Sequence, residues 1–144
     1  MDITHEFRIK TTVEKLYEAI TTEKGIHGWW AKDADVGRNT GEISRMRFAK
    51  EAGTVEMHFR VDAMLPSKKV SWTCVKNPNP AWIDTKIDLE MATVSPSEVK
   101  FKFNHSHWDP KWKGQLPYEQ TKEGWNHFMD SIKEYCETGV GKPW

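Results

Sequence analysis

The amino-acid sequence predicts an α+β fold: a curved antiparallel sheet of about six strands that wraps around a long C-terminal helix, with two short helices after the first strand. Between residues 42 and 107, apolar residues recur at every second position and short turn sequences separate the runs. Between residues 117 and 138, they recur at steps of three and four, which indicates an amphipathic helix. A chain of 144 residues suits one core, so residues 1–144 are predicted to form a single domain.

The N-terminal segment predicts one strand and two short helices. Polar residues alternate with an inward-facing set in the first strand, namely Ile3, His5, Phe7 and Ile9. Thr11 or Thr12 can cap a helix that runs through Ile20, and Thr21 or Thr22 can cap a second helix that two glycines shorten. The segment 32–40 is predicted to be a loop.

Five further strands are predicted to form a meander. They lie near Glu42–Phe48, Thr54–Met64, Lys69–Val75, Trp82–Val94 and Glu98–His107. The connectors contain glycine, proline, asparagine and serine and are short, which favours antiparallel neighbours. Alternation places Phe59, Trp72, Ile83, Ile87, Phe101 and Phe103 on the inner face and residues such as His58 on the outer face.

The final helix is predicted to begin at Pro117, because proline lacks a backbone N–H and residues in the first turn of a helix do not need one. It is predicted to end before Gly139, since glycine readily adopts the left-handed conformation of a C-cap. Its core-facing stripe comprises Tyr118, Thr121, Trp125, Phe128, Ile132 and Tyr135. His127 and Ser131 are spaced to touch, and we interpret that pair as a surface coincidence.

Composition excludes several classes of function. Lysine plus arginine and aspartate plus glutamate both number 21, so no strong net field attracts nucleic acid. No apolar run approaches the roughly 20 residues of a membrane span, so we expect a cytoplasmic protein without membrane insertion. Cys74 and Cys136 are distant in sequence and are predicted to be reduced core residues.

The order of elements resembles the helix-grip fold of the START-like, or SRPBCC, superfamily, and within it homologues of the heat-shock chaperone ATPase activator. The resemblance rests on the segment from Ile9 to Ile20, on Trp29-Trp30 ahead of Gly41, and on Gly124-Trp125 in the last helix. It implies a hydrophobic pocket between the sheet and that helix. Members of the superfamily serve as lipid or metabolite carriers, hormone receptors, cyclases and chaperone partners, so the fold does not settle the function.

We predict non-catalytic binding of a hydrophobic or amphipathic small molecule, such as a lipid, sterol, flavonoid or polyketide-like compound, without a cofactor. A mostly apolar cavity with a few polar groups is the usual form of such a site. The candidate ligand-binding residues are Trp30, Phe59, Trp72, Thr85, Phe101, Phe103, His105, Trp125 and Phe128. His105 and Thr85 are expected to orient the ligand, and Trp30 to lie near the opening.

Two alternatives come from other classes of function. His105 and His107 are two residues apart and are expected to share a strand face, where either can act as the acid or base of a cyclase or dehydratase, or bind a metal with His58 or His5. We expect no metal site, because no carboxylate or cysteine stands nearby at ligand spacing. The other alternative is a chaperone or stress cofactor that docks its partner through the Trp108–Trp112 loop, although we favour the loop folding back over the open end of the fold.

Overall fold

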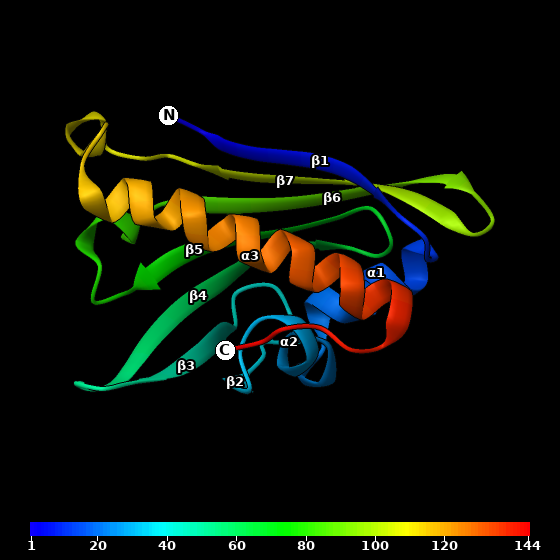
Figure 1. The fold of residues 1–144 in the computed structure, drawn as a ribbon, viewed down its shortest axis with the longest axis horizontal. Helices are drawn as coiled ribbons and strands as arrows, with labels where there is room; N and C mark the ends of the chain where they lie inside the picture. The colour runs from blue at the N-terminus through cyan, green and yellow to red at the C-terminus, as the bar shows by residue number, and fades with distance from the viewer.

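Seven strands form one antiparallel sheet in the order β1-β7-β6-β5-β4-β3-β2. The structure is a computed structural model that describes residues 1–144. The strands are β1 (Ile3–Ile9), β2 (Asp33–Asp35), β3 (Ile43–Lys50), β4 (Gly53–Leu65), β5 (Lys69–Lys76), β6 (Lys86–Ser95) and β7 (Glu98–Ser106). Because β1 pairs with β7, the first and last strands of the chain lie side by side, and β2 and β3 form the opposite edge (Figure 1).

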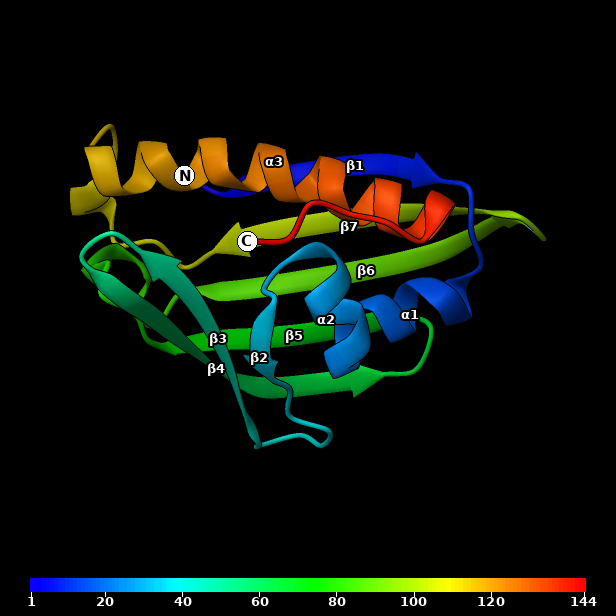
Figure 2. The ribbon, with the colours of Figure 1, turned by 60° about the horizontal axis from the view of Figure 1, so that its bottom comes forward.

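Three helices cover one face of this sheet. They are α1 (Val13–Thr21), α2 (Glu23–Trp29) and α3 (Leu116–Thr138), and two short 3₁₀ turns, Pro80–Trp82 and Pro110–Trp112, complete the elements. The long α3 lies across the sheet, with α1 and α2 beside its C-terminal half (Figure 1). Figure 2 shows the sheet curling beneath α3, with the β3–β4 hairpin rising beside the helix. The predicted fold class is therefore confirmed.

The structure has one strand more than the sequence predicted. Asp33–Asp35 forms β2 within the predicted loop and pairs with Arg45–Arg47 of β3. Arg47, on β3, stabilises β2 through ion pairs: its guanidinium nitrogens lie 3.1 Å from a carboxylate oxygen of Asp33 and 2.6 Å from one of Asp35. A three-residue edge strand has too few positions to display alternation, which explains why the pattern did not reveal it.

The predicted start of the strand near Trp82–Val94 is wrong. Residues 80–82 form a 3₁₀ turn, Asp84 adopts a φ of 68°, and β6 begins only at Lys86. Asn79 stabilises the turn by accepting a hydrogen bond from the backbone N–H of Ala81. Ile83, expected on the inner face, is therefore 39% exposed.

The predicted caps are confirmed at the starts of α1 and α2 and at the end of α3. Thr12 accepts a hydrogen bond from the Lys15 N–H at the start of α1, and Thr22 does the same for Gly25 at the start of α2. Gly139 ends α3 in the left-handed conformation, with a φ of 87°.

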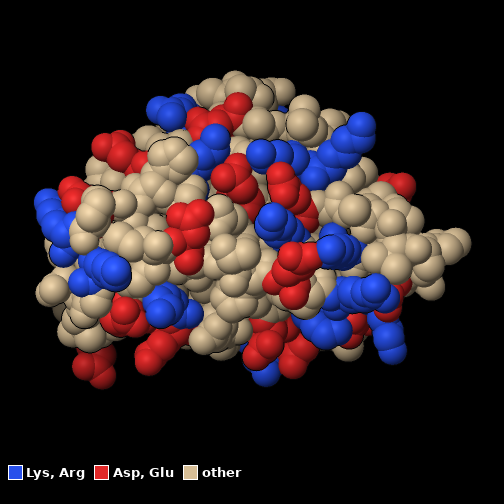
Figure 3. All heavy atoms as spheres, turned by 90° about the horizontal axis from the view of Figure 1, so that it is seen from above, with Lys and Arg blue, Asp and Glu red and all other residues tan.

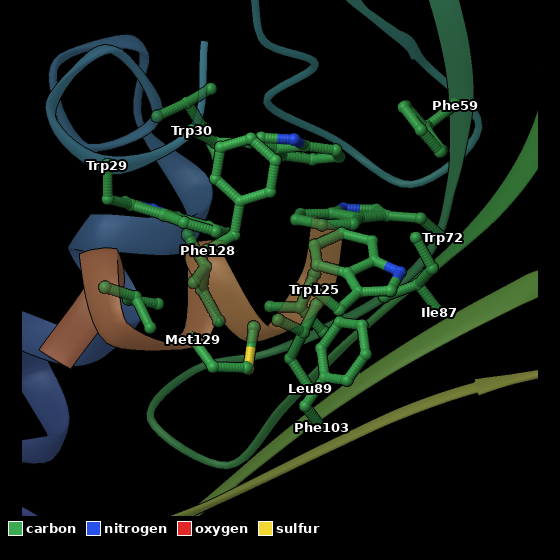
Figure 4. Close-up of a cluster of buried hydrophobic side chains, with 14 of the residues drawn as sticks. Trp29, Trp30, Phe59, Trp72, Ile87, Leu89, Phe103, Trp125, Phe128 and Met129 are labelled. Carbon is green, nitrogen blue, oxygen red and sulfur yellow. The ribbon is translucent and has the colours of Figure 1, made fainter. Parts of the chain in front are cut away.

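The core lies between the concave face of the sheet and α3, and aromatic residues occupy its centre (Figure 4). Trp30 stacks on Trp29 and Trp72, with ring centroids 5.6 and 5.8 Å apart respectively. Trp125, from α3, lies 5.5 Å from Trp30 and 4.5 Å from Phe103. These contacts join α2, α3 and the middle of the sheet into one cluster.

Residues 139–144 return along the molecule and bind the segment after α2. The Trp144 N–H donates to the Trp30 carbonyl, and the Lys32 N–H donates to the Trp144 carbonyl, both at 2.9 Å. Gly141 approaches this segment so closely that a Cβ there would lie 2.5 Å from the Gly28 carbonyl oxygen. The tail thereby places the Trp144 ring beside α3.

The surface location predicted for the His127–Ser131 pair is wrong for Ser131, and no hydrogen bond joins the two side chains. Ser131 is fully buried, donates to the Trp29 carbonyl at 2.7 Å and accepts from the Lys142 N–H at 2.7 Å. His127 instead bonds the Lys142 carbonyl at 2.8 Å. Both residues bind the C-terminal tail, residues 139–144. The helical pattern of the sequence alone does not predict where this tail lies.

Candidate functional site

A cavity of about 270 Å³ lies between the β3–β4 hairpin and the N-terminal half of α3. Its lining is mostly apolar: Trp30, Phe48, Lys50, Val55, Met57, Asn79, Trp82, Gln120, Thr121, Gly124, Trp125, Phe128 and Trp144. Strand alternation turns Val55 and Met57 towards the helix, and helical spacing brings Thr121, Trp125 and Phe128 to the facing side.

Gly124 opens the cavity in the middle of α3. A Cβ built at this position would have no atom within 4 Å, so no close packing excludes a side chain there. Gly25 is the opposite case, since its Cβ would lie 2.5 Å from the backbone of Ala19. The glycine in α3 leaves open space, whereas the glycine in α2 permits two helices to approach.

The walls are aromatic and the rim carries a positive charge. Trp82 stacks on Trp125 at 5.8 Å, and Phe128 packs against Trp144 at 4.8 Å, in each case between ring centroids. Trp144 is 49% exposed, and the Lys50 ammonium lies 5.0 Å from its ring centroid. An apolar interior with a polar rim follows from this arrangement.

The nine residues predicted to bind a ligand fall into two groups. Trp30, Trp125 and Phe128 line the cavity. The other six lie in the packed core beyond its lining, and all are at most 3% exposed: Phe59, Trp72, Thr85, Phe101, Phe103 and His105.

Most of the lining was not singled out from the sequence. Lys50 and Trp144 come from a hairpin end and from the tail, which no pattern places beside α3. Gly124 did carry a signal, because a glycine inside an amphipathic helix has a cost that packing or function must justify.

His105 is the centre of a buried hydrogen-bond network behind the Trp125 wall. Its Nδ1 accepts from the Trp125 indole N–H at 3.0 Å, so Nε2 carries the proton and donates to Thr85 Oγ1 at 2.8 Å. The Thr85 hydroxyl in turn donates to the Trp82 carbonyl at 2.6 Å. Burial lowers the pKa of His105 to about 3, which keeps the ring neutral. Both ring nitrogens are thus engaged inside the protein.

The expectation that His105 and His107 share a face is wrong. Strand β7 ends at Ser106, and His107 adopts a φ of 65° and is exposed. His58 lies on the outer face, where it contacts Glu56 at 2.7 Å. No group of three or more histidine, cysteine, aspartate or glutamate side chains in the structure is placed to hold a metal ion.

The segment from Trp108 to Trp112 folds back, as predicted. Trp108 is 7% exposed, donates its indole N–H to the His105 carbonyl at 3.0 Å, and packs edge-on against Tyr118. Trp112 is half-buried, with the Lys111 ammonium 5.4 Å from its ring centroid.

Charges of both signs are interspersed over the face seen in Figure 3. No helix of the structure combines the length and apolar character needed to cross a membrane. Cys74 and Cys136 are free thiols, and burial raises the pKa of each to about 12, so neither forms a reactive thiolate at neutral pH.

The sequence profile of the family described as Activator of Hsp90 ATPase homolog 1-like protein matches residues 10–137. The chain belongs to this family. The family is part of the START-like, or SRPBCC, superfamily, so the resemblance seen in the sequence is confirmed. The comparison with curated proteins finds no match.

Several solved structures have a similar fold. The solution structure of an Aha1 dimer from Colwellia psychrerythraea has a TM-score of 0.78 and 29% identity, over 98% of this chain and 99% of that one. A protein from Staphylococcus saprophyticus has a TM-score of 0.77 and 20% identity, over 99% and 96% of the two chains. DynU16, from the dynemicin biosynthetic locus, has a TM-score of 0.76 and 16% identity, over 97% of this chain and 48% of that one.

Proposed function

We propose that the protein binds a hydrophobic or amphipathic small molecule, without catalysis, in the cavity between the β3–β4 hairpin and α3. The observation that carries this proposal is Gly124. A glycine inside a helix costs about 1 kcal/mol relative to alanine. Since a Cβ at Gly124 would meet no atom within 4 Å, packing does not require this cost. An unfilled cavity that accommodates a ligand accounts for it.

The size and lining of the cavity define the ligand class. Its volume of about 270 Å³ lies close to the lower end of small-molecule sites, which run from about 300 to 1,000 Å³. The tryptophan and phenylalanine rings around it favour flat aromatic bodies or short acyl chains. Among the expected ligand classes, compact polyketide-like and flavonoid-like molecules fit this space better than a whole sterol.

The chemistry of the lining supports binding over turnover. None of its residues is a histidine, cysteine, aspartate or glutamate. His105, the acid or base of the cyclase alternative, lies outside the lining and has both ring nitrogens in internal hydrogen bonds. A general acid or base must reach the reacting group within hydrogen-bond distance or through one water.

Substitution of Gly124 tests the proposal. We expect Gly124→Leu to fill the cavity and weaken binding of the neutral fluorescent probe N-phenyl-1-naphthylamine at least tenfold, a loss of about 1.4 kcal/mol. Gly124→Ala is the matched variant, because it adds one methyl group and should raise the free energy of unfolding by about 0.5–1 kcal/mol while largely preserving binding. Fluorescence titration and urea unfolding measure the two effects.

The result that refutes the proposal is specific. If folded Gly124→Leu binds the probe as tightly as the unsubstituted protein, the probe does not occupy this cavity. If Gly124→Ala lowers stability, the open space beside the glycine is not present in solution.

Family membership supports a second candidate, the stimulation of a chaperone ATPase through protein contacts. The exposed surface at the start of α3 suits such contacts, since Leu116 is 67% exposed close to the half-buried Trp112. The two functions are separable. Stimulation of a chaperone ATPase that survives Gly124→Leu would act through the surface, independently of the cavity.

A further inference from the structure

We propose that the cavity selects ligands that carry a negatively charged group, such as a carboxylate, at one end of an apolar body. This inference rests on the proposed function and adds the charge and the orientation of the ligand. It follows from the polar groups that the cavity leaves without partners.

Two polar residues of the lining are already committed inside the protein. Thr121 Oγ1 accepts from the Trp82 indole N–H at 2.8 Å and donates to the Pro117 carbonyl at 2.9 Å. Asn79 accepts from the Ala81 N–H and donates to the same Pro117 carbonyl at 3.3 Å. Both side chains are therefore already hydrogen-bonded within the protein, which leaves them less capacity to select a ligand.

The groups that remain are chiefly hydrogen-bond donors. Lys50, Trp30 and Gln120 line the cavity, and the Lys50 ammonium, the Trp30 indole N–H and the Gln120 side-chain amide make no hydrogen bond within the protein. Of these three side chains, only that of Gln120 also has an accepting atom, its carbonyl oxygen. Because a polar ligand group must find a complementary partner when it leaves water, this set favours a ligand end rich in acceptors.

The charge around the opening strengthens the same preference. Lys50 has the only charged side chain of the lining, and that side chain makes no ion pair with an aspartate or glutamate. On the other side of Trp144, the surface hollow next to the cavity adds Lys32, Arg47 and Asp33. Arg47 is compensated by its acidic neighbours, whereas Lys32 and Lys50 are not. The opening therefore presents two lysine side chains without an ion-pair partner, Lys32 and Lys50.

The position of Lys50 sets the orientation of the ligand. Its ammonium lies beside the exposed Trp144 ring at the rim, while Trp30, Trp125 and Phe128 form the apolar interior. An anionic end is expected to stay at the rim, close to the ammonium and still partly hydrated. The apolar body then occupies the space beside Gly124.

A series of probes that share one apolar body tests this inference. We expect the protein to bind 2-naphthoate about five- to tenfold more tightly than the neutral 2-naphthamide, and the cationic 2-naphthylmethylamine more weakly than either, in low salt. Lys50→Gln should remove the preference between the acid and the amide. Lys50→Glu should reverse the order of acid and amine. Lys15→Gln, at an exposed lysine of α1 remote from the cavity, is the matched control and should retain the preference.

The outcomes separate the inference from the proposed function. Equal binding of acid, amide and amine, or a preference for the acid that survives Lys50→Gln, overturns the charge selection but leaves an apolar binding site in place. Failure of all three probes and of N-phenyl-1-naphthylamine to bind overturns the proposed function and this inference with it.

Discussion

Replacement of Trp30 by alanine is expected to lower the free energy of unfolding by about 3–5 kcal/mol, the usual cost of removing a buried aromatic side chain. Trp30 is 1% exposed and contacts aromatic rings from α2, α3, β4 and β5. Its removal leaves a void that joins the existing cavity. Urea unfolding followed by circular dichroism measures the loss.

Trp144→Ala is the matched control, because Trp144 lines the same cavity but is 49% exposed. Its substitution should cost only about 1 kcal/mol, since less apolar surface is lost from the interior. Trp30→Phe keeps part of the packing, so its smaller loss of unfolding free energy can be measured if the alanine variant is too unstable to fold. Equal losses for Trp30→Ala and Trp144→Ala would contradict the central position of Trp30.

Acidification is expected to destabilise the protein through His105. Burial holds the pKa of His105 at about 3 in the folded protein, against an ordinary value of 6.5. Between these values the unfolded chain binds the additional proton, so the free energy of unfolding falls as the pH falls through this window. From pH 6.5 to pH 4.5 this residue should account for a loss of about 2 kcal/mol.

Comparison with His105→Gln isolates the contribution of His105. Burial also lowers the pKa of His5, which adds a pH dependence of the same sign to both proteins. The difference between their stability curves therefore reports on His105. Should the variant fold poorly, the ring nitrogen shifts of His105 in the unsubstituted protein give the same answer by NMR. A His105 ring that becomes protonated above pH 5 would refute the buried network.

Most of the fold was accessible from the sequence because its elements carry repeated, redundant patterns. The long helix follows from six stripe positions and from Gly139, and each long strand shows several alternations. The predictions failed where a single residue has an unusual backbone conformation. Asp84 has a positive φ, and β6 begins only after it; His107 also has a positive φ, and its side chain does not share a face with His105.

The cavity was less accessible because its lining depends on how distant segments meet. The family resemblance located a pocket between the sheet and α3, and three of the nine named residues line the observed cavity. The rim of the cavity is formed by the end of β3 and by the C-terminal tail. The tail is held by hydrogen bonds from the Lys142 N–H to the Ser131 hydroxyl and from the Trp144 N–H to the Trp30 carbonyl. Sequence periodicity contains no information on such contacts. Gly124 contributes to the family resemblance, and the cost of a glycine inside a helix is a second signal in the sequence at this position.

The most direct test of ligand binding between the β3–β4 hairpin and α3 is an NMR titration of the delipidated protein, following the tryptophan indole N–H signals as 2-naphthoate is added. We predict saturable shifts for Trp30, Trp125 and Trp144, which line the cavity, and none for Trp29, which lies outside the lining and donates its indole N–H to the Ala19 carbonyl at 2.7 Å. The same titration of Gly124→Leu should show no saturable shift. Signals that stay unmoved at millimolar probe, or that move equally in Gly124→Leu, would contradict ligand binding in this cavity.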